Sequence, residues 1–282
     1  MKLVSFSAGG EDAYGAVVGD GIVNLSARIG AQFPDLKALL AGDGLAAAAE
    51  AAEGAEPDHG LDEVDYRPVI GNPDKIICVG LNYRAHREET GRAPTDNPAL
   101  FIRFADTQMG HNQPMIKPAA SDCLDYEGEL AVIIGKPGRH VKAADWASIV
   151  AGYAIYNDGS VRDFQNHTTQ WTSGKNFPST GGFGPWMVTA DELGDPTQLQ
   201  LTTRLNGEVM QDTTTDLMIF DIPTQIEYIT TFTELRPGDV ISTGTPGGVG
   251  FRREPPVFMF PGDTVEVEIS KIGTLVHPIV AE

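Results

Sequence analysis

The stretch Asp125-Tyr-Glu127-Gly-Glu129-Leu-Ala-Val-Ile-Ile134 joins two glutamates to an apolar, β-branched run. A run of this composition indicates the start of a strand. Side chains alternate between the two faces of a strand, so Glu127 and Glu129 point the same way. Two carboxylates on one face repel each other unless a positive charge lies between them.

A third acid, Asp158, ends a second apolar stretch that begins at Ile149. Three carboxylates that converge at strand ends suit a hard cation bound through oxygen, and we expect Mg²⁺ or Mn²⁺. Zinc is less favoured, because Cys123 and His167 have no partner at a zinc-like spacing. The alternative is that the three acids are solvated residues at strand ends.

Composition limits the classes of protein to which the chain can belong. Its 282 residues, 41% of them hydrophobic and 21% charged, predict a globular protein with one large domain, or one large and one small. The net charge of −19 argues against a nucleic-acid partner. No apolar run reaches the roughly 18 residues of a membrane span, and no signal peptide is evident. We expect a cytoplasmic protein in which Cys78 and Cys123 are buried free thiols.

The chain divides into two predicted units. Residues 1–65 predict a small N-terminal α/β domain, with a hairpin turning at 19–21, a helical region over 33–52 and a linker over 53–65. Residues 66–282 are mainly β, an α+β pattern that favours a sandwich or roll over a parallel sheet. The strands expected there cover 75–79, 130–134, 149–156, 198–205, 240–243 and 264–270, with helices over 81–90 and 222–232 and a hairpin turn at Asn206-Gly207.

Three further segments carry candidate chemistry. In a helix, His86 and Glu89 share a face, and a carboxylate beside an imidazole is how a general base is made. Arg162 and Gln165 lie four and seven residues past Asp158 and can face the same cation, and Lys175, among small and aromatic residues, is no ordinary surface lysine if its segment is buried. The loop 243–250 lacks the spacing of a nucleotide-binding loop, but its amides and the Thr245 hydroxyl can serve an anion. The alternatives are an exposed histidine, a surface loop and a plain glycine-proline turn.

Six motifs together resemble the fumarylacetoacetate hydrolase family, in order from about residue 70 to the C-terminus. They are Gly80-Leu-Asn-Tyr-Arg-Ala-His86, Asp125-Tyr-Glu-Gly-Glu-Leu-Ala-Val-Ile-Ile-Gly135, Tyr156-Asn-Asp-x4-Asp163-x-Gln165, Trp171-Thr-x-Gly-Lys175, Gly184-Pro185 and Thr243-Gly-Thr-Pro-x-Gly-Val249. The resemblance implies a mixed β-sandwich roll and a homodimer. It also implies Mg²⁺ or Mn²⁺ on Glu127, Glu129 and Asp158.

The resemblance further implies the roles of the remaining residues. His86 and Glu89 would activate water on a lid, and Arg162, Gln165, Lys175 and Thr245 match substrate-binding positions. Members hydrolyse acylpyruvates and other β-diketo acids, decarboxylate oxaloacetate, or tautomerise dienoic keto acids. We expect a metal-dependent hydrolase that cleaves a C–C bond in a 2,4-diketo acid, with Lys175 stabilising the developing oxyanion. An oxaloacetate-type decarboxylase or an enol–keto tautomerase is the alternative.

The segment after the predicted lid departs from the family pattern. Many members have a lysine where this chain has Phe101-Ile-Arg103-Phe104. This departure concerns substrate preference and leaves the predicted metal ligands unchanged. The sequence alone assigns no role to Arg103.

Overall fold

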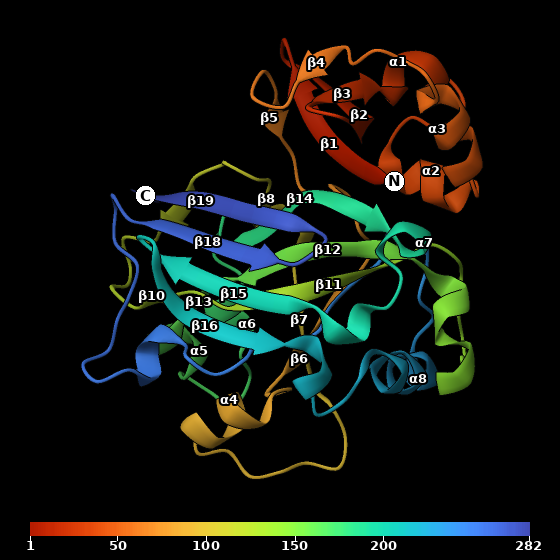
Figure 1. The fold of residues 1–282 in the computed structure, drawn as a ribbon. Coiled ribbons are helices and arrows are strands. Elements are labelled where there is room, and N and C mark those ends of the chain that lie inside the picture. Colours follow the sequence, from red (N-terminus) through yellow and green to blue (C-terminus); the bar gives the residue numbers. More distant parts are fainter.

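The computed structural model describes residues 1–282, which form mainly β structure (Figure 1). The larger sheet has 12 strands. Its main path runs β4 (His59–Gly60), β3 (Gly21–Asn24), β2 (Glu11–Val18), β1 (Lys2–Ala8), β14 (Gly181–Thr189), β12 (Val150–Asp158), β11 (Gly128–Ile134), β17 (Val240–Ser242), β6 (Ile76–Gly80) and β7 (Ala99–Arg103). Two short strands pair beside it, β5 (Asp65–Tyr66) with β1 and β8 (Gln108–Met109) with β14.

A second sheet of five strands lies against the middle of the first. Its order is β16 (Glu208–Thr214), β15 (Gln200–Leu205), β18 (Thr264–Ile269), β19 (Gly273–Ala281) and β9 (Met115–Lys117). The predicted hairpin between β15 and β16 is present, and Asn206 and Gly207 both have positive φ, as its tight turn requires. β10 (Leu124–Asp125) and β13 (Ser160–Val161) form a separate pair.

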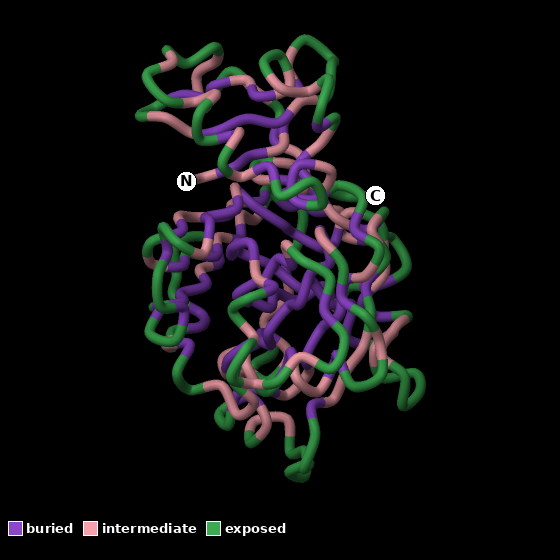
Figure 2. The backbone as a smooth tube through the Cα atoms, turned by 90° about the vertical axis from the view of Figure 1, so that its right-hand side faces the viewer, coloured by how far each residue is buried: buried purple, intermediate pink, exposed green.

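The two faces of β11 pack in different apolar clusters. Leu130, Val132 and Ile134 pack between the two sheets, together with side chains from β15, β18 and β19. Ala131 and Ile133 belong to a different apolar cluster. Because side chains alternate along a strand, Glu129 shares the face of Ala131 and Ile133. The acidic pair therefore points away from the core between the sheets, as the spacing predicts. Figure 2 shows this buried centre in purple.

The N-terminal residues form the upper lobe in Figure 1. The hairpin predicted at 19–21 joins β2 to β3, and the helical region divides into α2 (Leu36–Ala41) and α3 (Leu45–Ala52), after α1 (Leu25–Ile29). β1 pairs with β14, so the lobe and the rest of the molecule share one continuous sheet. The predicted division of the chain into 1–65 and 66–282 stays a prediction.

The helices of the remaining chain are short. α8 (Ile222–Phe232) has the predicted bounds and is capped by Asp221, which accepts a hydrogen bond from Thr224 N. The helix expected over 81–90 is only α4 (Arg84–Glu89), because Leu81 has φ +57° and the Asn82 side chain is bonded to the 220 and 243 loops. The others are α5 (Arg162–Gln165), α6 (Thr172–Lys175), α7 (Ala190–Leu193) and the 3₁₀ turns Ala105–Thr107, Ala143–Ile149, Pro196–Gln198, Thr215–Leu217 and Gly250–Arg252.

The two cysteines differ in how far they are exposed. Both cysteines are free, but only Cys78 is buried; Cys123 is half-exposed, because its segment follows the exposed turn at Ala119 and Ala120. The expectation that both thiols are buried is therefore wrong for Cys123. None of the helices has the length and hydropathy required to cross a membrane.

Candidate active site

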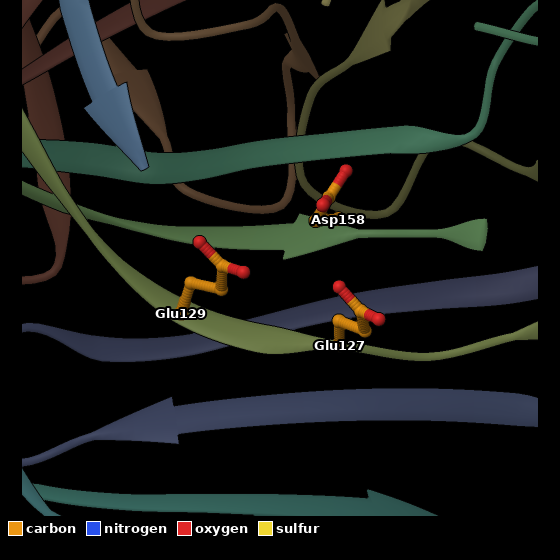
Figure 3. A group of neighbouring side chains, drawn as sticks. All are labelled: Glu127, Glu129 and Asp158. Carbon is orange, nitrogen blue, oxygen red and sulfur yellow. The ribbon is translucent and has the colours of Figure 1, made fainter. Parts of the chain in front are cut away.

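The three predicted carboxylates meet at the end of two paired strands (Figure 3). Glu127 and Glu129 flank Gly128 at the start of β11, and Asp158 ends β12, the antiparallel neighbour. The Asp158 amide donates to Glu127 O at 2.8 Å, which fixes the register. One oxygen from each side chain lies within 4.8 Å of the others, and exposed fractions of 4%, 2% and 0% exclude the solvated alternative.

Two of these carboxylates are held by buried cations. Lys175 Nζ donates to Glu127 Oε2 at 2.7 Å and to Asp158 Oδ2 at 2.6 Å. Arg162 Nη1 reaches Glu127 Oε1 at 2.5 Å, and Arg103 Nη1 reaches Asp158 Oδ1 at 2.6 Å. Burial by itself raises the pKa of Glu127, but the charges of Lys175 and Arg162 outweigh it and hold that pKa below its usual range.

Glu129 is different, because its partners are neutral. Its Oε2 accepts from the Ser242 hydroxyl and, at 2.8 Å, from the Gly244 amide. Burial, followed by the charges of Asp158 and Glu127, raises the pKa of Glu129 well above its usual value. A buried carboxylate without a cationic partner, beside two others, is the environment that a divalent cation would neutralise. The all-oxygen donor set therefore fits Mg²⁺ or Mn²⁺.

Arg162 is anchored by a residue that the sequence analysis missed. Asp125, fully buried, accepts from Arg162 Nε at 2.8 Å and from the amides of Gly250 and Phe251 at 2.9 and 3.0 Å. Asp125 lies within the quoted motif, but nothing in its spacing reveals a partner 37 residues away. Arg162 Nη2 is buried without a hydrogen-bond partner, although the side chain lines the central cavity. An unpaired guanidinium N–H there is a ready donor for an anionic ligand.

His86 and Glu89 form the predicted pair on α4. His86 Nδ1 lies 2.7 Å from Glu89 Oε1, and the other oxygen, Oε2, accepts from the Gly248 amide at 2.9 Å. The His86 side chain is only 7% exposed and lines the same cavity as Glu127 and Glu129. This excludes the exposed-histidine alternative. With Nδ1 engaged by the carboxylate, Nε2 is the nitrogen available for proton transfer.

The glycine-rich loop that joins β17 to the Gly250 turn organises the site through its backbone. Its amides at Gly244, Gly248 and Gly250 donate to Glu129, Glu89 and Asp125. The sequence analysis predicted that the amides of this loop can donate hydrogen bonds to an anion. In the structure they donate to carboxylates of the protein itself. Thr245 lines the cavity, but its hydroxyl donates to Gly128 O and accepts from Gln211 Nε2.

The remaining predicted residues line one cavity with the carboxylates. Gln165 accepts from Arg162 Nη1 at 3.0 Å through its Oε1. The cavity is lined by Val79, Gly80, Leu81, His86, Thr90, Arg92, Phe101, Glu127, Glu129, Arg162, Gln165, Asn166, Trp171, Lys175, Thr245, Phe251 and Arg252. Asp158 and Glu89 do not line this cavity but are hydrogen-bonded to two residues that do, Lys175 and His86. Every residue predicted for the site is therefore brought to one place.

These features define the class of protein. It is a β-sandwich protein with a buried three-carboxylate site, a lysine between two of the acids and a histidine–glutamate pair beside them. Residues 75–280 match the family model described as Fumarylacetoacetate (FAA) hydrolase C-terminal. The chain belongs to the fumarylacetoacetate hydrolase family, and the predicted fold class is confirmed by solved structures of that family.

Two curated relatives show how similar the chain is to named proteins. The human protein named Oxaloacetate tautomerase FAHD2A, mitochondrial, is 40% identical over 220 residues, covering 77% of this chain and 70% of that protein. A Dictyostelium discoideum protein named Fumarylacetoacetate hydrolase domain-containing protein 2 homolog is 42% identical over 218 residues, covering 73% and 72%.

Two solved structures extend the similarity to the full chain. One is maleylpyruvate hydrolase from Sphingobium sp. SYK-6, in complex with manganese (II) ion and pyruvate. It has a TM-score of 0.83, is 32% identical and covers 100% of this chain and 99% of its own. The other, 5-carboxymethyl-2-hydroxymuconate delta-isomerase from Mycobacterium smegmatis, has a TM-score of 0.78, is 33% identical and covers 100% and 99%. Homologues of this chain are thus enzymes that act on small keto acids.

Proposed function

We propose that the protein is a divalent-metal-dependent hydrolase that cleaves a C–C bond in a 2,4-diketo acid. The observation that carries this proposal is the His86–Glu89 pair, in which His86 lines the same cavity as Glu127 and Glu129. Hydrolysis needs an activated water, and an imidazole oriented by a carboxylate is a suitable general base. The exclusion of bulk water from the carboxylates favours strong electrostatic interactions with a bound substrate.

Glu127, Glu129 and Asp158 would hold the cation. When bound, Mg²⁺ or Mn²⁺ supplies a Lewis acid that polarises the oxygens of the keto acid. Arg162 offers its unpaired Nη2 to the substrate carboxylate. Thr245 must release Gly128 O before it can donate to the same group.

His86 Nε2 takes a proton from water while Glu89 holds Nδ1. The water oxygen bonds to the C4 carbonyl, and the C3–C4 bond then breaks with its electron pair on C3. The acyl part leaves as a carboxylic acid, and the other part leaves as an enolate that takes at C3 the proton held on His86 Nε2, which restores the neutral imidazole. Lys175 has three N–H donors and uses two on Glu127 and Asp158, which leaves one for the oxyanion. The Gln165 amide N–H₂ supplies another donor, since only its Oε1 is engaged.

A second candidate is an oxaloacetate tautomerase or decarboxylase. Several relatives that are about 40% identical are named oxaloacetate tautomerases, which favours this reaction. Tautomerisation uses the same residues differently: His86 would move a proton between C3 and the enol oxygen, and no water would be consumed. Decarboxylation needs the enolate stabilisation but no base that activates water.

One experiment separates the candidates. We expect the wild type with Mn²⁺ to hydrolyse an acylpyruvate, and His86→Gln to lose about 10²–10⁴ of that rate, the usual contribution of a positioned base. The His86→Gln variant should bind Mn²⁺ as tightly as the wild type, because the only carboxylate that His86 contacts through a hydrogen bond is Glu89, which is not one of the three predicted metal ligands. Oxaloacetate tautomerisation in the absence of any acylpyruvate hydrolysis would establish the second candidate instead.

The predicted homodimer and the cytoplasmic location also stay proposals. The family resemblance supports the dimer, and light scattering of the purified protein at several concentrations measures it. A monomer at micromolar concentration would contradict it.

A further inference from the structure

Two aromatic rings, one beside each of two buried cations, flank the carboxylates of the cavity. Glu127 accepts from Arg162 Nη1 at Oε1 and from Lys175 Nζ at Oε2, so it lies between the two cations. The Arg162 guanidinium carbon lies 4.3 Å from the centre of the Phe251 ring. Lys175 Nζ lies 5.0 Å from the centre of the Phe101 ring. Arg162 and Phe251 therefore mark one side of the cavity, and Lys175 and Phe101 mark the other.

Trp171 extends the aromatic surface on the Lys175 side. The Phe101 and Trp171 rings meet edge to face, with their centres 5.5 Å apart, and both side chains line the cavity. Trp171 and Lys175 lie four residues apart around the short helix α6, which places them on the same side of it. The six-membered ring of Trp171 lies against Gly80, where a Cβ would be 2.3 Å from Cζ3. The surface that begins at Lys175 thus continues over Phe101 and Trp171.

Packing in the interior does not account for the Trp171 ring. It belongs to none of the apolar clusters of the core, it is half-buried, and it follows the exposed segment 166–170. A large apolar ring that is left partly exposed in a ligand cavity buries further surface when a ligand covers it. The ring is therefore placed to contact a ligand.

The reaction proposed above sets the direction in which a substrate crosses this cavity. Its carboxylate is bound by Arg162, and the oxyanion at C4 is stabilised by Lys175. The carbon chain beyond C4 therefore continues from Lys175 toward Phe101 and Trp171. An aromatic surface binds apolar groups that remove it from water, so methylene groups suit this side of the cavity.

We propose that Phe101 and Trp171 form the binding surface for the acyl chain of the substrate, from C5 onward, and thereby determine specificity for chain length. Gly80 is a positioning residue, because its lack of a side chain allows the Trp171 ring to lie against the wall. This inference rests on the proposed keto-acid function. It adds that the acyl group has an apolar stretch next to the carbonyl that is attacked.

Calorimetric binding of straight-chain 2-oxo acids to the Mn²⁺-loaded protein tests this surface. The series runs from 2-oxobutanoate, which ends at C4, through 2-oxopentanoate and 2-oxohexanoate to 2-oxoheptanoate. We expect the affinity of the wild type to rise about two- to fourfold with each added carbon, the range for a methylene that is half to fully buried. In Trp171→Ala the rise over the whole series should be less than about threefold.

Two further variants separate contact with the ligand from support of the fold. Gly80→Ala retains the indole but moves it from the wall, and should flatten the series as Trp171→Ala does. Phe251→Leu changes the aromatic ring on the Arg162 side. It should weaken the binding of all four acids by the same factor and leave the rise with chain length unchanged.

The outcomes distinguish the acyl-chain surface from the reaction. Equal affinity for the four acids in the wild type, no binding of any of them, or a rise that survives in Trp171→Ala would contradict the surface. A rise that survives only in Gly80→Ala retains the surface and removes the role of Gly80. These acids lack a 4-keto group, so the measurement needs no hydrolysis. If acylpyruvates are not hydrolysed but the rise is present and is lost in Trp171→Ala, the reaction is wrongly assigned and the surface is retained.

Discussion

Asp158 is held on both oxygens, by Arg103 at Oδ1 and by Lys175 at Oδ2. The Arg103 guanidinium also donates to Gly159 O at 2.9 Å and to Thr180 Oγ1 at 2.7 Å, and the side chain is fully buried. This residue occupies the position at which the sequence departs from the family pattern. The several N–H donors of the planar guanidinium bind the Asp158 carboxylate and the backbone at Gly159 together, which the single nitrogen of a lysine would not do.

We predict that Arg103→Lys weakens Mn²⁺ binding by roughly 10–100-fold, as loss of a partner that orients a metal ligand usually does. The charge is kept, but a single ammonium nitrogen cannot occupy the positions of both Nη1 and Nη2, from which Arg103 reaches Asp158, Gly159 and Thr180. Calorimetric titration with Mn²⁺ measures the effect. Arg204→Lys, at a partly exposed pair with Glu268, is the control and should leave the affinity unchanged. Wild-type affinity in Arg103→Lys would show that Arg103 does not position Asp158.

Among the elements, the loop after β17 links the two halves of the site. It donates to the predicted ligand Glu129 through Gly244 and to Glu89 of the His86–Glu89 pair through Gly248. Gly248 has φ +100°, and a Cβ there would lie 2.2 Å from Met210 O. A side chain at this position must therefore displace the loop.

Gly248→Ala is predicted to lower kcat more than tenfold, because Glu89 loses the hydrogen bond from the Gly248 amide. The affinity for Mn²⁺ should stay within a factor of about three of the wild type, because Glu129 keeps the hydrogen bond from the Gly244 amide. Gly207→Ala is the matched control, because Gly207 also has positive φ but a Cβ there meets nothing within 4 Å. Both variants should lose about 1–2 kcal/mol of stability from the backbone conformation, and Gly248→Ala should lose more than Gly207→Ala because of its contact with Met210 O. If kcat falls equally in both, the loss reflects stability and not the position of Glu89.

At the scale of the whole molecule, β19 carries a buried histidine that makes stability depend on pH. Burial lowers the pKa of His277 to about 4, against 6.5 for an unperturbed side chain. Its Nδ1 lies 2.9 Å from Gln113 O, and Nε2 is buried without a partner. As pH falls below 6.5, the unfolded chain takes up this proton before the folded chain does, so folding is disfavoured.

The free energy of unfolding should therefore decrease from about pH 6.5 toward pH 4, by up to roughly 3 kcal/mol from this group alone. Urea denaturation between pH 5 and 7.5 measures the slope where most carboxylates remain ionised. His277→Asn, whose amide can keep the bond to Gln113 O, should show a flatter profile. An identical slope in wild type and variant would contradict the assignment.

The limits of prediction from sequence follow from the distance between partners. Alternation in β11, the Asn206-Gly207 turn and the helix over 222–232 were predictable from local signals, and the structure has all three. Arg103 with Asp158 and Asp125 with Arg162 join residues 55 and 37 apart, and only the packing of the sheet brings them together. The shortened α4 has the same kind of cause, because Asn82 is held by loops more than 130 residues away.

The central claim is that Glu127, Glu129 and Asp158 bind a divalent cation. Titrating chelator-treated protein with Mn²⁺ and counting the bound ion by electron paramagnetic resonance tests it most directly. We predict one Mn²⁺ per chain in the wild type, and a loss of at least 100-fold in affinity in Glu129→Gln, which removes the carboxylate that lacks a cationic partner. No bound Mn²⁺ in the wild type, or equal affinity in Glu129→Gln, would contradict the account.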